Sequence, residues 1–208
     1  MSGEITLYRA LASRAFPVLW LLEELDLDYR SKIVSVADWR RPERLLEITP
    51  FGKVPAVVDG ETVVTEAPAI LPLPGRPLRL WRAVPEGRGA GPRALPEVDG
   101  LVDRGAGASA RAAAHHRGPA EERLGVGWPA WDLVLKELAD TVAHRQWLLG
   151  DRFSAADVML GSVLSIGLFC EMIPPLPPLV AYNERLADRP ANRRAGQLNW
   201  PPARFSPT

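Results

Sequence analysis

The sequence predicts an α/β arrangement in its N-terminal part and a helical arrangement toward its end. Valine-rich runs on both sides of Asp59-Gly60 indicate a β-hairpin over residues 54–64. An alternating stretch at residues 4–8 is followed by leucines at helical spacing, which indicates a strand and then a helix. Ser154 and Asp157 precede a long apolar run that is typical of a buried helix.

The composition is that of a globular protein without an overall charge. With 208 residues, 47% of them hydrophobic, the chain can build the core of one large or two small domains. Lys and Arg total 25, and Asp and Glu also total 25. This balance provides no field to attract nucleic acid or an anionic membrane, so we expect neither as a partner. A small neutral or amphipathic substrate fits better.

The sequence favours a cytoplasmic protein. The first ten residues, MSGEITLYRA, lack the basic and apolar regions of a signal peptide, and no stretch reaches about 18 consecutive apolar residues. Cys170 is the single cysteine, which excludes a disulfide framework and agrees with a reducing compartment.

Strand and helix patterns alternate before the hairpin. Ser13 occupies the expected N-cap of a helix whose apolar residues share one face, and Pro17 falls in its first turn. A second strand is expected over residues 27–36, and a polar helix or loop over residues 39–48.

The hairpin carries the most informative residues. Because Pro55 cannot donate to a ladder, it belongs at an edge or at the first position of its strand. There, a cis bond would leave the N–H and C=O of Val54 available to a peptide-like ligand. Glu66 follows the second strand at the expected N-terminus of a helix, where backbone N–H groups attract a carboxylate.

Lys53-Val54-Pro55 followed by Glu66 at this spacing resembles the glutathione site of the cytosolic glutathione S-transferases of bacterial type with a serine-class active site. The resemblance implies that the Val54 backbone pairs with the cysteine of glutathione and that Pro55 is cis. It also implies that Glu66 and Ala67 hold the γ-glutamyl end. Members of the family usually carry serine or threonine where this chain has Ala67, so we expect weaker binding rather than none.

The resemblance also implies a domain organisation. It identifies the order βαβαββα as that of a thioredoxin-like, glutathione-binding domain over residues 1–75. It identifies residues 76–208 as an all-α C-terminal domain, which completes a glutathione S-transferase fold. Dimerisation is expected from the family, so a homodimer is predicted.

Three side chains outside the hairpin core have two interpretations each. Ser13 is either simply the cap of the first helix or the donor of a hydrogen bond to the glutathione sulfur, which would favour the thiolate. Arg14 is either a second catalytic group that adds positive charge or a solvated helix residue. Lys53 is either an exposed loop lysine or the partner of the glycine carboxylate of glutathione. Tyr8 is interpreted as a strand residue rather than as a catalytic tyrosine.

The C-terminal part shows a structural motif rather than a catalytic one. The Ser154–Asp157 pattern is that of a capping box, in which the aspartate reaches back to the cap N–H. Residues 158–172 are apolar nearly all round, which predicts a buried central helix with Cys170 as inert packing. A further amphipathic helix is expected over residues 179–187.

The pattern is lost between residues 72 and 124, whose sequence or order is therefore doubtful. Pro and Gly recur every few residues with Arg and Ala between them. The simplest interpretation is a disordered linker or lid. However, a structureless loop of this length inside a compact fold argues against an assignment, and it would remove helices that build the dimer interface and substrate pocket.

A frame-shifted middle segment is an alternative hypothesis. Read one nucleotide later, residues 72–79 make Leu-Tyr-Leu-Ala-Asp-Arg-Tyr available, and residues 94–108 allow the amphipathic run RYLKWMVWSTAVLEP. Two compensating errors would bracket the region, with the frame restored near residues 123–125. The gene's nucleotide sequence tests this hypothesis, because stop codons in the shifted frame would exclude it. Since His115 and His116 fall in this segment and adjacent helical residues face different ways, no metal site is predicted.

The predicted function is glutathione transfer to a small apolar electrophile in detoxification, with glutathione as cosubstrate and no metal. Such an enzyme lowers the pKa of the glutathione thiol from about 8.5 toward neutrality and holds the electrophile nearby. Glutathione-dependent reduction, dehalogenation or isomerisation would use the same residues. A non-catalytic binding or scaffold protein on the same fold remains the alternative, because a fold does not determine a function.

Overall fold

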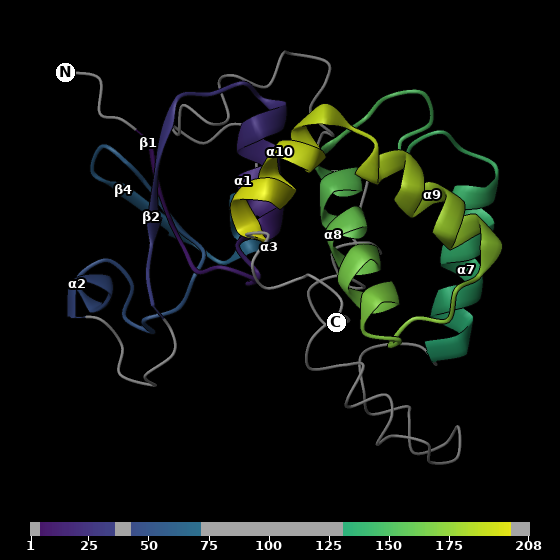
Figure 1. The fold of residues 1–208 in the computed structure, drawn as a ribbon, viewed down its shortest axis with the longest axis horizontal. Helices are drawn as coiled ribbons and strands as arrows, with labels where there is room; N and C mark the ends of the chain where they lie inside the picture. Colours follow the sequence, from purple (N-terminus) through teal and green to yellow (C-terminus); the bar gives the residue numbers. More distant parts are fainter. Residues whose placement is uncertain (1–4, 36–42, 72–130, 201–208) are drawn as a thin grey trace. The chain divides into compact units, whose positions relative to one another are not determined.

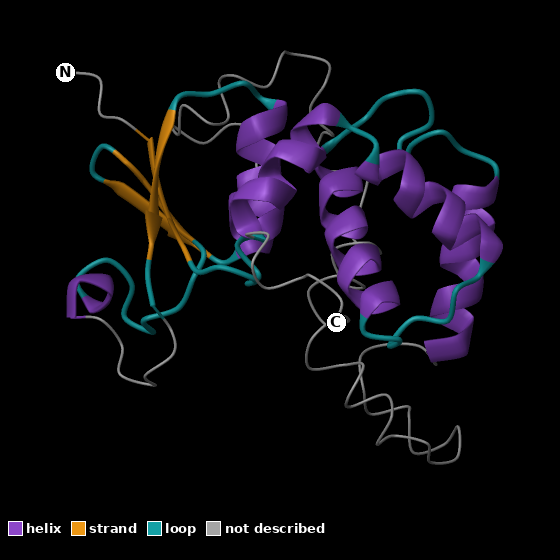
Figure 2. Ribbon diagram, viewed as in Figure 1, coloured by secondary structure: helices purple, strands orange, loops and turns teal. Residues whose placement is uncertain are grey.

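The computed structural model describes residues 5–35, 43–71 and 131–200, which divide into two compact units (Figure 1). The first unit contains all the described strands together with residues 188–200. The second unit contains residues 131–187, in which helices are joined by loops (Figure 2).

The first unit has a four-stranded sheet in the order β2-β1-β3-β4. β1 and β2 are parallel, whereas β1–β3 and β3–β4 are antiparallel. This arrangement confirms the predicted thioredoxin-like order βαβαββα. In chain order the elements are β1 (Ile5–Arg9), α1 (Phe16–Glu24), β2 (Tyr29–Ile33), α2 (Glu43–Leu46), β3 (Ala56–Asp59), β4 (Thr62–Thr65) and α3 (Ala67–Ile70).

The core of this unit lies between the sheet and α1. The inward residues of β1 alternate along the strand, and Leu7 is completely buried. α1 buries nearly its whole length, including Trp20. Each buried aliphatic or aromatic side chain of this kind contributes about 1.5–3 kcal/mol, so this layer holds the ends of the strands in place.

The hairpin has the predicted form. Asp59 pairs with Thr62 across a loop made of Gly60 and Glu61. Gly60 has φ +62°, a left-handed conformation that glycine adopts without steric cost. Pro55 immediately precedes β3, and the Val54–Pro55 peptide bond is cis, as the resemblance implied.

Helix α10 (Pro190–Asn199) packs on α1 within the first unit. This placement differs from the expected division, in which residues 76–208 form one helical domain. No separate helix was predicted over residues 190–199, because this stretch is mostly polar and Arg189-Pro190 looks like the end of the preceding helix. Pro190 instead begins α10, where a missing N–H is tolerated. The expected boundary after residue 75 lies outside the described residues.

The second unit consists of α7 (Trp131–Ala143), α8 (Ala155–Phe169) and α9 (Pro177–Ala187), and α9 contacts both of the others. The capping box is confirmed. Ser154 is the N-cap of α8 and Asp157 accepts a hydrogen bond from its backbone N–H. Because the cap is Ser154, α8 begins at residue 155 rather than at the expected residue 158.

Cys170 corrects the expectation of inert packing inside this helix. α8 ends at Phe169, and Cys170 is its exposed C-cap residue. The chain then folds back so closely that a Cβ on Gly167 would lie 2.4 Å from Cδ1 of Ile173. The turn buries Ile173 against the last turn of α8 and leaves the cysteine outside.

Some expectations fall outside the described residues. These are the irregular segment 72–124 with the frame-shift hypothesis, and both His115 and His116. Of the helices that the structure does describe, none has the length and apolar character needed to span a membrane.

Candidate glutathione site at the strand ends

Three predicted segments leave the sheet at the same end. Tyr8 pairs with Ala56, and Ala56 pairs with Thr65. The loop that follows β1, the residues that precede β3 and the residues that follow β4 therefore begin side by side. This register brings together the segments of Ser13, of Lys53, Val54 and Pro55, and of Glu66 and Ala67.

Ser13 lies in the turn between β1 and α1 but is not the N-cap that the sequence predicts. The N-cap is Ala15, and α1 begins at Phe16. The Ser13 hydroxyl donates to the carbonyl of Ala10 at 2.6 Å and accepts from the N–H of Ala15 at 3.3 Å. Because Ser13 satisfies a donor ahead of the helix, it shapes the turn rather than closing the helix end.

Val54 offers the backbone groups that a peptide ligand needs. Ala56 is the first residue of β3. Across residues 5–35, 43–71 and 131–200, no backbone hydrogen bond involves the N–H or C=O of Val54. Pro55 is buried and Val54 is half-buried, so the N–H and C=O of Val54 lie on a packed segment at the end of the sheet.

Glu66 is the N-cap of α3 and has an unusual backbone conformation. Its φ and ψ are 69° and 122°, outside the regions that non-glycine residues prefer. Its carbonyl accepts from the N–H groups of Ala69 and Ile70, while its exposed side chain does not cap the helix. Such strain costs about 1–3 kcal/mol and is concentrated at functional sites.

The neighbouring candidates differ in exposure. Ala67, which follows Glu66, is buried, and its methyl group supplies no hydroxyl donor. Lys53 and Arg14 are both exposed, on the segments before β3 and before α1. This exposure suits either a solvated residue or a residue that meets a ligand carboxylate.

Arg9 is a buried charged residue that the sequence analysis missed. It is only 3% exposed, and its Nε donates to Ser31 Oγ at 2.7 Å. Its Nη1 is buried without a partner among the described residues, and burial lowers its pKa. The signal was present in the alternation of Ile5, Leu7 and Arg9, which places the arginine on the inward face of β1.

The neighbouring residue of β1 confirms another expectation. Tyr8 is a strand residue whose hydroxyl accepts from Lys32 Nζ at 3.1 Å, and the ammonium lies 5.1 Å from the ring centroid.

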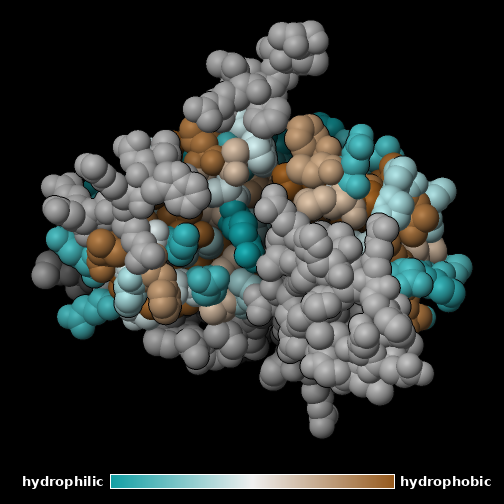
Figure 3. All heavy atoms as spheres, turned by 90° about the horizontal axis from the view of Figure 1, so that it is seen from below, coloured by the Kyte–Doolittle hydropathy of each residue, from teal (hydrophilic) through white to brown (hydrophobic). Residues whose placement is uncertain are grey.

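On the face seen in Figure 3, hydrophilic and hydrophobic residues are interspersed over the coloured surface. Within the described residues, no cluster of three His, Cys, Asp or Glu side chains is placed to hold a metal ion.

Comparisons with known proteins show what the N-terminal part of the chain resembles. Residues 13–72 match the family model "Glutathione S-transferase, N-terminal domain". Glutathione S-transferase 3 of Schizosaccharomyces pombe is 37% identical over 67 residues, which are 32% of this chain and 28% of that protein.

Solved structures extend the likeness along the chain. A glutathione transferase from Methylococcus capsulatus aligns with a TM-score of 0.70 at 24% identity, over 94% of this chain and 98% of that one. The theta class glutathione S-transferase from Xanthomonas axonopodis pv. citri, solved with glutathione bound, aligns with a TM-score of 0.63 at 26% identity, over 94% and 97%. Residues 13–72 therefore resemble a glutathione S-transferase N-terminal domain, within a chain that has the glutathione S-transferase fold.

Proposed function

We propose that this chain is a glutathione transferase that binds glutathione at the strand ends and adds its thiolate to a small apolar electrophile. The observation that carries the proposal is the meeting of three segments at one end of the sheet, where no described residue pairs with the backbone groups of Val54. An extended tripeptide satisfies such groups by pairing as an additional strand. Residues 13–72, which match the N-terminal domain model, include all the proposed site residues.

Each part of glutathione has a proposed partner. The Val54 N–H and C=O pair with the cysteine backbone, and Lys53 pairs with the glycine carboxylate. The Glu66 carboxylate binds the α-amino group of the γ-glutamyl end, and the N–H of Ala67 binds its carboxylate. The hydrogen bonds that involve a charged group contribute about 1.5–3 kcal/mol each, and the neutral backbone pairs of Val54 about 0.5–1.5 kcal/mol each.

Ser13 stabilises the thiolate in this proposal. Its hydroxyl proton rotates from the Ala10 carbonyl to the sulfur, while its oxygen keeps the N–H of Ala15. Ser13 also lies just ahead of α1, where the positive end of the helix favours a negative sulfur. Arg14 adds charge from the same turn. The thiolate then attacks the electrophilic carbon, a carbon–sulfur bond forms and the leaving group departs with its electron pair.

The second candidate is a glutathione-independent binding or scaffold protein on the same fold. Two observations favour it: Ala67 supplies no hydroxyl, and the Ser13 hydroxyl already donates to Ala10. For the first candidate, the enzyme, we further propose that it is a cytoplasmic homodimer that acts in detoxification and has no nucleic acid or membrane partner.

Glu66→Gln provides the test, with Glu61→Gln as its matched control. Both glutamates are exposed, but Glu61 lies in the hairpin loop at the opposite end of β3 and β4. Calorimetric titration with glutathione is expected to show binding weakened about tenfold or more by Glu66→Gln, and unchanged by Glu61→Gln. Equal effects of the two substitutions, or no binding by the unaltered protein, would overturn the proposal.

A further inference from the structure

The turn that carries Ser13 is tied to the far end of the chain. The N–H of Ala12 donates to the carbonyl of Asn199, the last residue of α10, at 3.2 Å. Ala12 is exposed and has φ 51°, a left-handed conformation that alanine rarely adopts without support. A bond from the end of α10 therefore supports the residue next to Ser13.

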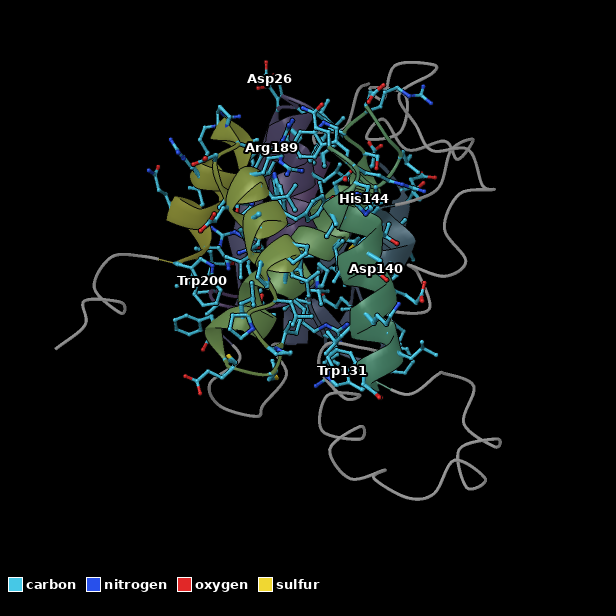
Figure 4. The ribbon with its side chains drawn as sticks, turned by 90° about the vertical axis from the view of Figure 1, so that its right-hand side faces the viewer. Asp26, Trp131, Asp140, His144, Arg189 and Trp200 are labelled. Carbon is cyan, nitrogen blue, oxygen red and sulfur yellow. The ribbon has the colours of Figure 1, made fainter. Side chains whose placement is uncertain are left out.

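α10 is itself firmly seated on α1. Ala191, Ala195 and Asn199 recur every fourth residue along one face and are buried, so the two helices approach closely. At the start of α10, Arg189 donates from Nε and Nη2 to the two carboxylate oxygens of Glu24 at 2.6 and 2.7 Å. Figure 4 labels Arg189 and Trp200, which flank the two ends of this helix.

The Arg189–Glu24 pair is the stronger of two anchors. Its side chains are 26% and 12% exposed, and Glu24 Oε1 also accepts from Nε1 of the buried Trp20 at 2.8 Å. The second anchor, from Arg194 to the Glu23 carboxylate at 2.8 Å, is more exposed. A bidentate, half-buried pair sets both the position and the direction of α10.

Asn199 carries a second unusual feature. It is completely buried, and its Oδ1 and Nδ2 have no partner in the part of the chain that the structure describes. A buried unpaired amide lowers stability, and an apolar side chain of similar shape would avoid this cost. Packing alone therefore does not account for asparagine here.

We propose that α10 is a positioning element for the turn of residues 10–15, acting through the Asn199 carbonyl and anchored by Arg189 and Glu24. The inference rests on the proposed function for the ligand that the turn serves. Ser13 contributes to thiolate formation only when its hydroxyl is correctly placed, and small displacements of a reacting group cost up to about a hundredfold in rate.

Arg189→Met tests the anchor, because it removes the charge and keeps an unbranched stem. Arg193→Met is the matched control, since Arg193 lies on the same helix and pairs with the exposed Asp188 rather than with α1. Hydrogen exchange of the peptide that contains residues 10–15 is expected to accelerate about tenfold in Arg189→Met. Exchange that is unchanged, or equally fast in both variants, would overturn the proposal.

Two further measurements distinguish the positioning role from general stability and from the proposed function. At a temperature well below unfolding, Arg189→Met should raise the apparent pKa of bound glutathione thiol, read from thiolate absorbance, while Arg193→Met should not. Faster exchange without this shift would leave α10 a structural clamp and overturn its positioning role. If the unaltered protein binds no glutathione, the proposed function fails and with it the positioning role, whatever the exchange result.

Asn199→Leu separates the backbone carbonyl from the side chain. This variant keeps the carbonyl that holds Ala12 and removes the unpaired amide. We expect unchanged exchange in residues 10–15 together with a higher melting temperature. Faster exchange in this variant would show that the side-chain amide of Asn199 restrains the turn of residues 10–15, and would overturn the role of the carbonyl.

Discussion

Polar groups have opposite roles in two regions of the molecule. One region is the buried cluster around Asp157 in the second unit, which we call the polar hub, and the other is the strand-end site of the first unit. In the hub, the carboxylate of Asp157 accepts from the N–H groups of Leu148 and Ser154, from the Ser154 hydroxyl and from the Tyr182 hydroxyl. At the site, the backbone of Val54 is unpaired within the described residues and Glu66 is exposed and strained.

The difference separates a structural use of polar groups from a binding use. A completely buried carboxylate is tolerated because several donors surround it. Groups that await a ligand must instead keep their hydrogen-bonding capacity and remain near the surface. Removing one member of the hub should therefore destabilise the fold, whereas removing one member of the site should change ligand chemistry with little effect on stability.

The largest effect is expected from Asp157→Ala. This change leaves the buried donors of Leu148, Ser154 and Tyr182 without their common acceptor, so the free energy of unfolding should fall by more than about 3 kcal/mol. Urea denaturation measures the loss. Asp140→Ala is the control, because its salt bridge with Lys136 on α7 is exposed, and it should leave stability unchanged. A small effect of Asp157→Ala would remove the contrast between the two regions.

Ser13→Ala should come next, with an effect on the reaction rather than on the fold. If the hydroxyl stabilises the thiolate, kcat for conjugation of a chromogenic aryl halide should fall about a hundredfold. Ser13→Thr keeps a hydroxyl and should restore part of the activity. Ser162→Ala, which removes a hydroxyl that donates to a helix carbonyl of α8, is the control. Full activity in Ser13→Ala would favour another thiolate partner such as Arg14.

The Tyr182 hydroxyl makes the hub sensitive to alkaline pH. Burial, followed by the charge of Asp157, raises the pKa of Tyr182 above the ordinary value of about 10. The stability that this proton provides is therefore complete below pH 10 and is lost as pH rises toward the folded-state pKa.

Tyr182→Phe should lower the free energy of unfolding by about 1–2 kcal/mol at pH 7. It should also make the alkaline fall in melting temperature less steep. Burial and Glu23 also raise the pKa of Tyr29, so part of the fall should remain. Tyr8→Phe is the control, because it removes a tyrosine hydroxyl in the first unit, outside the hub. An equally steep alkaline fall in Tyr182→Phe would contradict the assignment.

Ala67→Ser should give the smallest effect and act in the opposite direction. It adds one hydroxyl beside Glu66, so glutathione affinity should increase about threefold, the gain at the lower end of what one added hydrogen bond provides. Ala69→Ser on the same short helix is the matched control and should leave the affinity unchanged. Weaker binding by Ala67→Ser would show that the buried methyl group at this position is needed for packing.

Local patterns were sufficient for the hairpin and for the N-terminal cap of α8. The turn at Gly60 and the Ser154 capping box were predicted correctly because their signals lie within a few neighbouring residues. The position of the N-cap before α1 was wrong by two residues, because Ser13 and Ala15 both lie in a turn whose shape depends on the Ala10 carbonyl.

Distant pairings were missed for a physical reason. Arg189 and Glu24 are 165 positions apart, and neither residue carries a local signal of the other. The buried Asn199 lies at the end of a helix whose mostly polar sequence is typical of a solvent-exposed helix. Its bond to Ala12 exists only because α10 packs against α1.

The sequence by itself determined the order of strands and helices up to the hairpin, the hairpin itself and the capping box, because each depends on backbone preferences and hydrophobic spacing over short stretches. The tertiary structure decided that α10 joins the first unit, that Arg189 pairs with Glu24, and that Ala12 pairs with the last residue of α10. These features depend on which faces are available when helices and strands pack, and contacts between distant parts of a chain leave no periodic signal.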